Sequence, residues 1–242
     1  MNRSTTRAQA GAALLALALT ACGGASHGTS GTGGSAPQAT ASTPAANGVA
    51  AMRAAQATRV ALATLTSARS VHMTGTFSAN GRSEHFDMVF AGDSADGSFT
   101  LNGVPVQVVA CDGAMYLKAD QDGWAAMGNP ADMAGMMAGR WFKVSSAQAP
   151  GTTPLSLAFF TAELTAHATM APATVTQGTL SGRQVAVVTY PDGSRLYVAA
   201  TGPAYPLRLD VTGDTGGRRD FSDYGAAVHI AAPHGAADIS DG

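Results

Sequence analysis

Cys22 is the residue near the N-terminus whose type and position have the clearest chemistry. It ends the motif Leu19-Thr20-Ala21-Cys22, directly after an apolar run. A cysteine thiolate is a strong nucleophile and can accept a lipid group on its sulfur. The small side chain of Ala21 keeps the peptide bond between Ala21 and Cys22 accessible to a peptidase. The motif therefore predicts a cysteine that is modified on sulfur and exposed by cleavage of the bond before it.

The residues before Cys22 have the plan of a secretory signal. Arg3 and Arg7 precede the apolar stretch 12–19, and residues 1–21 contain no acidic side chain. That stretch is far shorter than the roughly 20 residues of a membrane-spanning helix. Residues 1–21 therefore resemble the signal peptide of bacterial lipoproteins, in which the cysteine receives a diacylglyceryl group before cleavage. The alternative is an ordinary signal peptide in which Cys22 has no part.

A lipidated Cys22 predicts secretion across the cytoplasmic membrane and a lipid anchor on its outer face, in the cell envelope. Two or three acyl chains of the palmitate type anchor stably, since each buried methylene contributes about 0.8 kcal/mol. Residues 23–48 have no charged, aromatic or large aliphatic side chain, so we expect a disordered tether. The predicted organisation is a signal peptide at 1–21, the lipidated cysteine and tether at 22–48, and one domain at 49–242.

The composition excludes several classes of function. Charged residues make up 12% of the chain, about half the usual share, and the largest cationic cluster is the pair Arg218-Arg219. A basic stripe is missing, so we expect no nucleic-acid partner. Cys111 would have no disulfide partner once Cys22 is acylated. We expect Cys111 to be a small buried side chain; a reactive thiol is the alternative.

Motifs for catalysis or cofactor binding are missing from the sequence. The six histidines are not spaced as metal ligands, and no G-x-S-x-G elbow, P-loop or dinucleotide motif occurs. We therefore expect no enzyme, no cofactor and no metal site. His72 and His85 are expected on a solvated strand face, and Asp220, Asp223 and Tyr224 in a structural turn. A catalytic triad assembled only by the fold stays open, which leaves a hydrolase as the most distant hypothesis.

The secondary-structure pattern predicts a single α+β domain. An alanine-rich helix is expected over 49–69, a short helix over 129–137, and a helix over 153–168 with Pro154 in its first turn. Alternating apolar residues and Asn-Gly or Asp-Gly turns predict antiparallel hairpins in series. About ten strands are expected, at 71–77, 84–90, 97–101, 104–111, 114–118, 175–180, 184–190, 195–198, 205–211, 218–224 and 228–230, with a strand-like island at 139–144.

Several short motifs in this order resemble a known family. They are VHMTGTF (71–77), AMYLKAD (114–120), GRWFKV (139–144), SRLYVAATGPAYPLRLDVTG (194–213) and DFSDYG (220–225). Together with the lipoprotein signal they are similar to actinobacterial lipoproteins of the LppX/LprG type, over roughly residues 49–235. The resemblance implies a strongly curved antiparallel sheet, a half-barrel, with helices packed on its concave face, as in the carrier LolA. It also implies that acylated lipids or lipoglycans are held between sheet and helices and moved across the envelope.

Large apolar side chains from strands and helices are the candidate lining of such a lipid cavity. These residues are Phe86, Met88, Phe90, Met115, Leu117, Met133, Met136, Met137, Phe159 and Phe160. Methionine adapts readily to acyl chains of different shape. The same residues would equally form a filled core. The predicted function is therefore an envelope lipoprotein that binds a lipid or lipoglycan and assists its transport. The alternative is a membrane-tethered binding or accessory protein without lipid cargo, and the sequence names neither the lipid nor any transporter partner.

Overall fold

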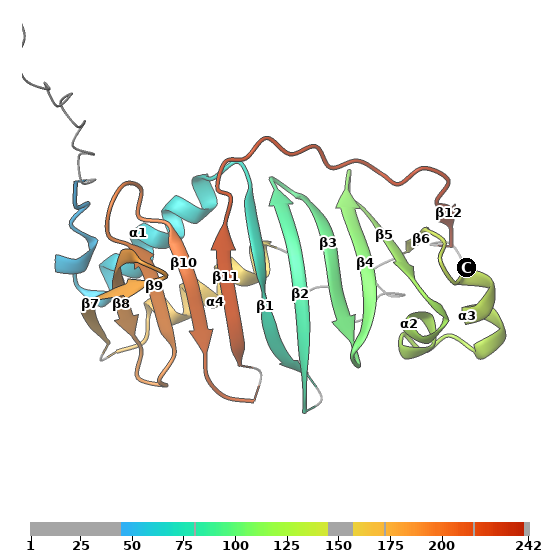
Figure 1. Cartoon of the computed structure of the whole chain (residues 1–242), viewed down its shortest axis with the longest axis horizontal. Helices are drawn as coiled ribbons and strands as arrows, with labels where there is room; N and C mark the ends of the chain where they lie inside the picture. The colour runs from blue at the N-terminus through green and yellow to red at the C-terminus, as the bar shows by residue number, and fades with distance from the viewer. Residues whose placement is uncertain (1–44, 80, 145–156, 172, 215, 240–242) are drawn as a thin grey trace, which may run out of the picture. The chain divides into compact units, whose positions relative to one another are not determined.

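The computed structural model describes residues 45–79, 81–144, 157–171, 173–214 and 216–239 (Figure 1). Cys22, the signal peptide and most of the tether lie outside the described residues. The helical elements of the described part are η1 (Val49–Ala51), α1 (Ala54–Ser67), α2 (Gln121–Ala126), α3 (Ala131–Met137) and α4 (Leu157–Ala168). The strands are β1 (Val71–Ala79), β2 (Arg82–Ala91), β3 (Ser94–Leu101), β4 (Val104–Cys111), β5 (Ala114–Ala119), β6 (Phe142–Val144), β7 (Thr174–Leu180), β8 (Arg183–Thr189), β9 (Arg195–Ala199), β10 (Pro206–Val211), β11 (Gly217–Ser222) and β12 (Ala237–Asp238).

One sheet contains all twelve strands of the described ranges. Its order is β12-β6-β5-β4-β3-β2-β1-β11-β10-β9-β8-β7, and neighbouring strands are antiparallel except β12 and β6. Strands β1–β6 and β7–β11 form two meanders, which meet where β1 pairs with β11. The open, curved and mostly antiparallel sheet with its helices confirms the predicted α+β class.

Tight turns connect neighbouring strands within the meanders. Asn102-Gly103 joins β3 to β4, Asp112-Gly113 joins β4 to β5, and Ser181-Gly182 joins β7 to β8. Both residues of each turn have positive φ, which is the geometry of type I′ hairpins and matches the twist of the strands. The Asp-Gly turn signal at 112–113 is thereby confirmed.

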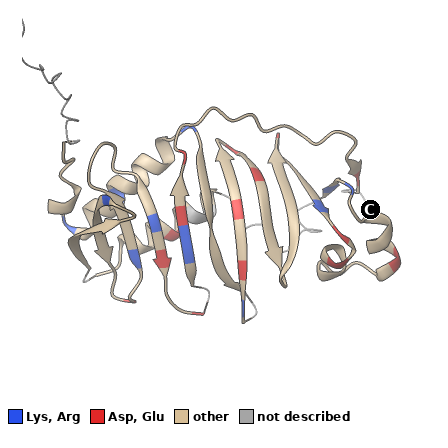
Figure 2. Cartoon of the chain, viewed as in Figure 1, with Lys and Arg blue, Asp and Glu red and all other residues tan. Residues whose placement is uncertain are grey.

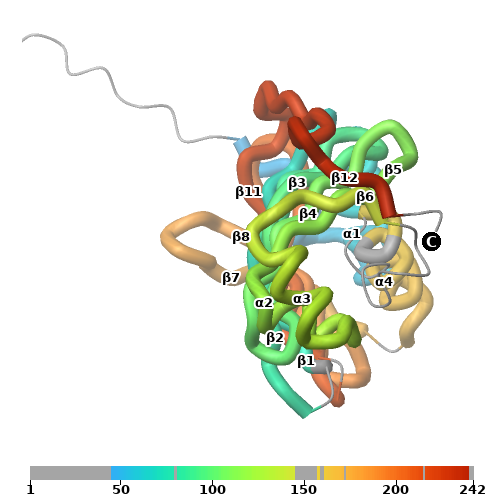
Figure 3. The backbone as a smooth tube through the Cα atoms, turned by 90° about the vertical axis from the view of Figure 1, so that its right-hand side faces the viewer, coloured from blue at the N-terminus to red at the C-terminus, as the bar shows by residue number. Residues whose placement is uncertain are grey.

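Helices α1 and α4 cover one face of the sheet. They lie behind the part of the sheet that runs from β8 to β1 in Figure 1, and Figure 3 shows both on the same side of the strands. Ala57, Ala61 and Leu65 of α1 are fully buried and share a core with Leu196 and Leu209 of the strands. The small alanine side chains let α1 approach the sheet closely. This half of the concave face is therefore filled by the helix.

Two glycines allow β1 and β11 to meet closely. A Cβ at Gly75 would overlap the carbonyl oxygen of Arg218, and a Cβ at Gly217 would overlap that of Thr76. Gly217 also has φ +152°, a conformation that residues with side chains rarely adopt. Glycines in adjacent strands are typical of tight bends in curved sheets. The junction of β1 and β11 is thus a place where the sheet can curve into a half-barrel.

Some sequence predictions differ from the structure. The helix expected over 49–69 is interrupted, because Met52 and Arg53 are extended before α1 begins. Helix α2 was not predicted at all. The strand expected at 228–230 is wrong: this segment carries no strand and runs along the ends of β1–β5 toward β12 (Figure 1). Residues 153–156 of the last expected helix lie outside the described residues, and α4 begins at Leu157.

Cys111 lies on β4 and is buried, with 3% of its surface exposed. Burial raises the pKa of its thiol, and the nearby charge of Asp112 raises it further. A thiol with a raised pKa is mostly protonated at neutral pH and therefore a poor nucleophile. The prediction of a small buried side chain at this position is confirmed.

Candidate functional site

An apolar pocket lies at the end of the sheet where α2, α3, β6 and β12 meet. Its volume is about 730 Å³, within the range of about 300–1,000 Å³ that is typical of small-ligand sites. Its walls are mainly methionine, aromatic and aliphatic side chains. We call it the methionine pocket, and its lining residues are Trp124, Asn129, Met133, Met136, Met137, Arg140, Phe142, Val144, Asp238 and Ile239.

The short helix α2 positions Trp124 in this pocket. Asp120 caps the helix by accepting a hydrogen bond from the Gly123 amide (2.7 Å), which satisfies one of the free amides of the first turn. Trp124 is 2% exposed and meets the Phe142 ring edge to face, with 5.4 Å between ring centroids. Asn129 donates from its side-chain nitrogen to the Trp124 carbonyl (3.0 Å). The indole is therefore held by packing and by the chain around it.

Helix α3 supplies the three methionines of the pocket. Met136 and Met137 follow Met133 by three and four residues, so both are neighbours of Met133 on the helix surface. Met137 is 5% exposed, whereas Met133 is 48% and Met136 67% exposed. Large apolar side chains left in contact with water beside a pocket are typical of ligand or partner sites. The structure brings together three residues of the predicted cavity lining here.

The C-terminal strand forms one wall of the methionine pocket. β12 pairs in parallel with β6, and the Ala237 amide donates to the Trp141 carbonyl (3.0 Å). The Ile239 amide donates to the Lys143 carbonyl (3.1 Å). Lys143 and Asp238 add an ion pair at 2.9 Å between Nζ and Oδ2. These contacts hold Asp238 and Ile239 against the pocket.

The strand residues of the predicted lining belong to the core or pack against it. Phe86, Met88 and Phe90 of β2 are 4%, 1% and 2% exposed, and Leu117 of β5 is fully buried, whereas Met115 is half-buried. None of the five is among the residues that line the methionine pocket. Phe159 and Phe160 belong to α4 by their backbone, but their side chains lie outside the described part.

Strand β5 links this core to the methionine pocket. In the register of β5 and β6, Met115 is opposite Val144 and Leu117 is opposite Phe142, and both β6 residues line the pocket. The predicted residues of β5 are therefore next to the pocket, while those of β2 are three strands away along the sheet. The predicted set is thus divided between a packed core and an open pocket.

Other lining residues were not predicted from the sequence. Arg140 and Phe142 belong to the motif GRWFKV, whose paired aromatic residues and arginine were read only as a strand. Trp124 was missed because α2 is short and contains glycine. For Asp238 and Ile239 the sequence offers no signal, since their place depends on the pairing of β12 with a strand 95 residues earlier.

A buried polar cluster lies between α4 and the sheet. Arg219 of β11 points inward, is 3% exposed, and forms an ion pair with Glu163 of α4 (3.0 Å from Nε to Oε2). Burial raises the pKa of Glu163, and the charges of Arg219 and His167 offset this only in part. Burial also lowers the pKa of the Arg219 guanidinium, with Glu163 opposing. These groups fix α4 against β11.

A second contact of this cluster joins α1, α4 and the turn between β8 and β9. The hydroxyl groups of Thr58 and Tyr190 share a hydrogen bond of 2.8 Å, and the Tyr190 ring lies 4.8 Å from that of His167. Burial raises the pKa of Tyr190 to about 12. The Nε2 atom of His167 lies 3.6 Å from the Asp192 carboxylate. The two helices are therefore fastened to the sheet by polar contacts as well as by apolar packing.

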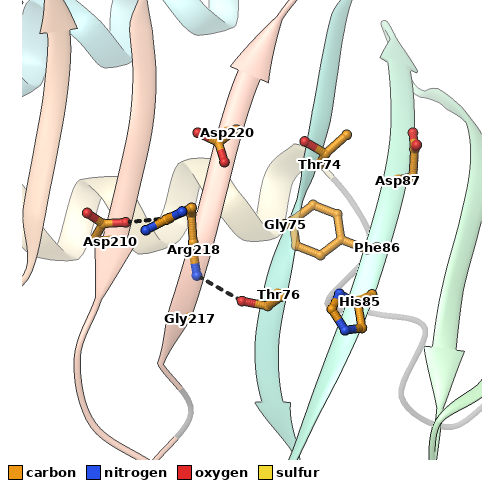
Figure 4. Close-up of a pocket in the computed structure, with 10 residues that line it drawn as sticks. All are labelled: Thr74, Gly75, Thr76, His85, Phe86, Asp87, Asp210, Gly217, Arg218 and Asp220. Carbon is orange, nitrogen blue, oxygen red and sulfur yellow. Dashed lines mark hydrogen bonds and ion pairs between the residues drawn. The ribbon is translucent and has the colours of Figure 1, made fainter. Parts of the chain in front are cut away.

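A polar hollow of about 580 Å³ lies on the opposite, convex face over β10, β11, β1 and β2 (Figure 4). Asp210 pairs with Arg218 (3.3 Å) and Asp220 with Arg208 (2.6 Å). Acidic and basic side chains alternate along β10 and β11 on this face (Figure 2). Each carboxylate of these two strands that lines the hollow is thus engaged by an arginine, which is typical of a solvated sheet surface.

On the same face, His72 lies close to a serine and two aspartates. Its Nε2 lies 2.7 Å from Asp87 and its Nδ1 lies 3.3 Å from both Asp223 and the Ser222 hydroxyl. Ser222 also donates to Asp223 (3.1 Å). A catalytic relay needs one nitrogen on the nucleophile and the other on the acid. Here carboxylates face both ring nitrogens, and the Ser222 hydroxyl donates to the Asp223 carboxylate, so the grouping lacks the arrangement of a catalytic relay.

Two further findings concern metals and membranes. Among the described residues, no group of three His, Cys, Asp or Glu side chains is arranged to hold a metal ion. No helix of the described ranges is long and apolar enough to cross a membrane.

Known proteins of similar structure include mycobacterial lipoproteins. No protein-family model matches the sequence, and no curated protein matches it. LprF from Mycobacterium bovis is 16% identical with a TM-score of 0.50, over 75% of this chain and 97% of LprF. The lipoprotein LppX from Mycobacterium tuberculosis is 14% identical with a TM-score of 0.45, over 74% of this chain and 98% of LppX. The Pseudomonas aeruginosa MucA/MucB complex gives 15% identity and a TM-score of 0.37, over 73% of this chain and 58% of that chain.

The likeness to LprF concerns the fold. The resemblance to the LppX/LprG type, predicted from the order of short motifs, is confirmed at the level of the fold by LprF. At this level of sequence identity the likeness concerns the α+β architecture with its curved sheet. What the protein binds has to be argued from its own residues.

Proposed function

We propose that this protein is an envelope lipoprotein that binds an acylated lipid or lipoglycan and assists its transfer between membrane and envelope. The observation that carries the proposal is the methionine pocket, an open apolar site of about 730 Å³. Two of its methionines, Met133 and Met136, are 48% and 67% exposed. Apolar surface of this size in water is unfavourable, and each acyl methylene buried against it contributes about 0.8 kcal/mol.

The pocket chemistry suits an acyl chain better than a polar ligand. Three flexible thioether side chains can follow chains of different length and unsaturation. Trp124 and Phe142 provide a rigid aromatic floor on which the chain would pack. The wall formed by Ile239 completes an apolar lining.

We further propose that acylated Cys22 anchors the domain to the outer face of the cytoplasmic membrane. A flexible tether over 23–44 would have an end-to-end distance of about 23–28 Å. The tether joins the domain beside β9, whereas the methionine pocket lies at the β12-β6 end of the sheet. A domain that lies along the membrane would bring the pocket to the membrane surface, where it could receive or release a lipid. Anchoring and carriage would then act together, with the anchor raising the local concentration of lipid at the pocket.

Tryptophan fluorescence tests lipid binding directly. The chain has two tryptophans: Trp124 lines the pocket, and Trp141 directly precedes the lining residue Phe142. The processed chain from residue 22, carrying Cys22→Ser so that no anchor competes, is titrated with a lysophospholipid whose acyl chain is brominated. We expect saturable quenching of the emission. Absence of quenching over the whole range of monomeric lipid concentrations would refute lipid binding at this pocket.

A matched pair of variants ties the signal to the pocket. Met136→Glu places a charge in the pocket, whereas Val228→Glu places one at an exposed apolar residue outside it (41% exposed). We expect Met136→Glu to weaken quenching about tenfold or more, because the carboxylate would have to be desolvated beside the acyl chain. Val228→Glu should leave it unchanged. Equal effects of both variants would mean that the lipid binds elsewhere.

A second candidate function is a tethered binding protein with a filled core and no lipid cargo. The burial of Phe86, Met88 and Phe90, each at most 4% exposed, favours this reading for the concave face of β2. Native mass spectrometry of protein made in an envelope-bearing host separates the two. A discrete added mass that organic solvent removes supports carriage, and an apo mass without uptake of added lipid supports the second function.

A further inference from the structure

We propose that the lipid taken by the methionine pocket has an anionic headgroup, a phosphate or carboxylate, and that Arg140 receives it. This inference rests on the proposed function, since it assigns the polar end of a ligand whose acyl chain occupies the pocket. It names a chemical class of lipid and the residue that selects it.

The charges that line the pocket do not balance. Asp238 and Arg140 are the two charged residues among its lining. The Asp238 carboxylate is paired with Lys143 at 2.9 Å. Arg140 takes part in none of the ion pairs among the described residues. The pocket therefore presents one positive charge without an opposite charge beside it.

The surroundings of Arg140 place that charge at the mouth of an apolar site. Its guanidinium lies 5.6 Å from the centroid of the Phe142 ring, which orients the planar group through a cation–π contact. The backbone is held on both sides, since the Gly139 amide donates to the Ala119 carbonyl (2.8 Å) and the Arg140 amide to that of Met137 (3.1 Å). An acyl chain lying on Met137 and Phe142 would therefore carry its headgroup toward the guanidinium.

The guanidinium group suits an oxygen anion in particular. It presents several N–H donors in one plane and binds carboxylate or phosphate through two parallel hydrogen bonds. The acidic residues of the neighbouring helices, Asp122 of α2 and Asp132 of α3, do not line the pocket. A second cation near this end of the sheet, Lys118, lies 5.8 Å from the centroid of the Trp141 ring.

The test compares two lipids that differ only in headgroup. Lysophosphatidylglycerol and lysophosphatidylcholine with the same brominated acyl chain are titrated into the processed Cys22→Ser chain, with tryptophan quenching as the readout. We expect the anionic lipid to bind about three- to tenfold more tightly, the effect of one partly exposed charge-assisted contact. The preference should fall as salt is raised. Equal affinity of the two lipids at low salt would overturn the assignment.

Variants of Arg140 locate the preference. Arg140→Gln should bring the two lipids to the same affinity, and Arg140→Lys, which keeps the charge, should restore most of the difference. Arg183→Gln is the matched control, because Arg183 is an exposed arginine on β8, far from the pocket in the strand order. A preference that survives in Arg140→Gln would refute the role of Arg140. Circular dichroism verifies that each variant is folded.

Two other outcomes are separable. Quenching by neither lipid would overturn the proposed function together with this inference, whereas equal quenching by both would overturn the inference alone. Inorganic phosphate is titrated separately, with the side-chain NMR signal of Arg140 as the readout. Saturable binding of millimolar phosphate without an acyl chain, at an affinity equal to that of the anionic lipid, would show a site for the free anion and refute the lipid assignment.

Discussion

Arg219 of β11 and Glu163 of α4 form an ion pair in the interior between sheet and helix, with 3.0 Å between Nε and Oε2. Their side chains are only 4% and 18% exposed. A buried pair adds little net stability because both charges lose their hydration, but it disfavours every arrangement in which the two groups do not meet. The contact therefore sets the position of α4 over the concave face.

Replacing Arg219 alone should lower the free energy of unfolding more than replacing both Arg219 and Glu163. We expect Arg219→Met to lower the free energy of unfolding by about 3–5 kcal/mol, because it leaves a buried carboxylate without its partner. The double variant Arg219→Met, Glu163→Leu should recover most of that loss. Urea denaturation measures all three proteins. A double variant as unstable as the single one would show that the pair stabilises through its charges.

The titration of Glu163 provides a second prediction. Its pKa is raised by burial and partly restored by Arg219, so Arg219→Met should raise it further. Glutamate labelled with ¹³C at the carboxyl group gives a simple spectrum, because the chain has only Glu84 and Glu163. An unchanged titration of Glu163 in the variant would argue against the ion pair.

The raised pKa of Glu163 makes the stability of the protein depend on pH. A carboxyl group with a raised pKa binds its proton more tightly in the folded protein than in the unfolded chain. The contribution of Glu163 to stability is therefore complete below the ordinary pKa of glutamate and is lost as the pH rises through the raised value. In Arg219→Met this loss should extend to higher pH, which urea denaturation across a pH series will measure.

Two glycine substitutions should have opposite effects. Gly75→Ala forces a methyl group against the Arg218 carbonyl at the junction of β1 and β11, and we expect a loss of about 2–4 kcal/mol. Gly135→Ala in α3 has no atom nearer than 3.8 Å to the added Cβ, so it should gain about 0.5–1 kcal/mol from helix propensity. Thermal unfolding compares them. A neutral Gly75→Ala would show that the junction can relax.

The pocket wall formed by β12 can be tested with proline. Ala237→Pro removes the amide that donates to the Trp141 carbonyl (3.0 Å), since proline has no N–H. We expect faster amide hydrogen exchange at Ile239 and weaker lipid-induced quenching. Ala231→Pro, in the exposed segment before β12 that carries no strand, is the control and should leave both unchanged. If both variants behave alike, β12 is not a wall that the ligand needs.

Local pattern was enough to predict most of the sheet. The alternation of Phe86, Met88 and Phe90 with polar neighbours places β2 with one buried face, and the Asp-Gly turn at 112–113 is formed as expected. These features depend on residues close in sequence, where turn geometry and side-chain period carry the information. Cys22 and residues 23–44 of the predicted tether lie outside the described residues, so the lipid anchor stays a prediction. Residues 45–48 belong to the folded part, because Ala46 bridges to Thr201 and the Asn47 side chain donates to the Ala199 carbonyl (2.8 Å).

The pocket was only partly predictable, because it depends on contacts between distant parts of the chain. The methionines of α3 were identified, since their helical spacing is local. Met136 is exposed while Phe90 belongs to the packed core, and no local pattern encodes this difference. The inward direction of Arg219 is likewise a matter of register: it faces Gly75 across the strands, beside an outward-facing Arg218 of the same type.

The pairing of β1 with β11 also bears on how the chain folds. Both meanders are built from hairpins with short turns, which form quickly because little chain entropy is lost in closing them. The β1–β11 junction instead joins His72 to Ser222, 150 residues apart, and its two strands fit only through Gly75 and Gly217. We expect the closing of this junction to limit the folding rate, because non-local pairing is slow. Until the junction closes, two half-sheets would expose their edges to other chains.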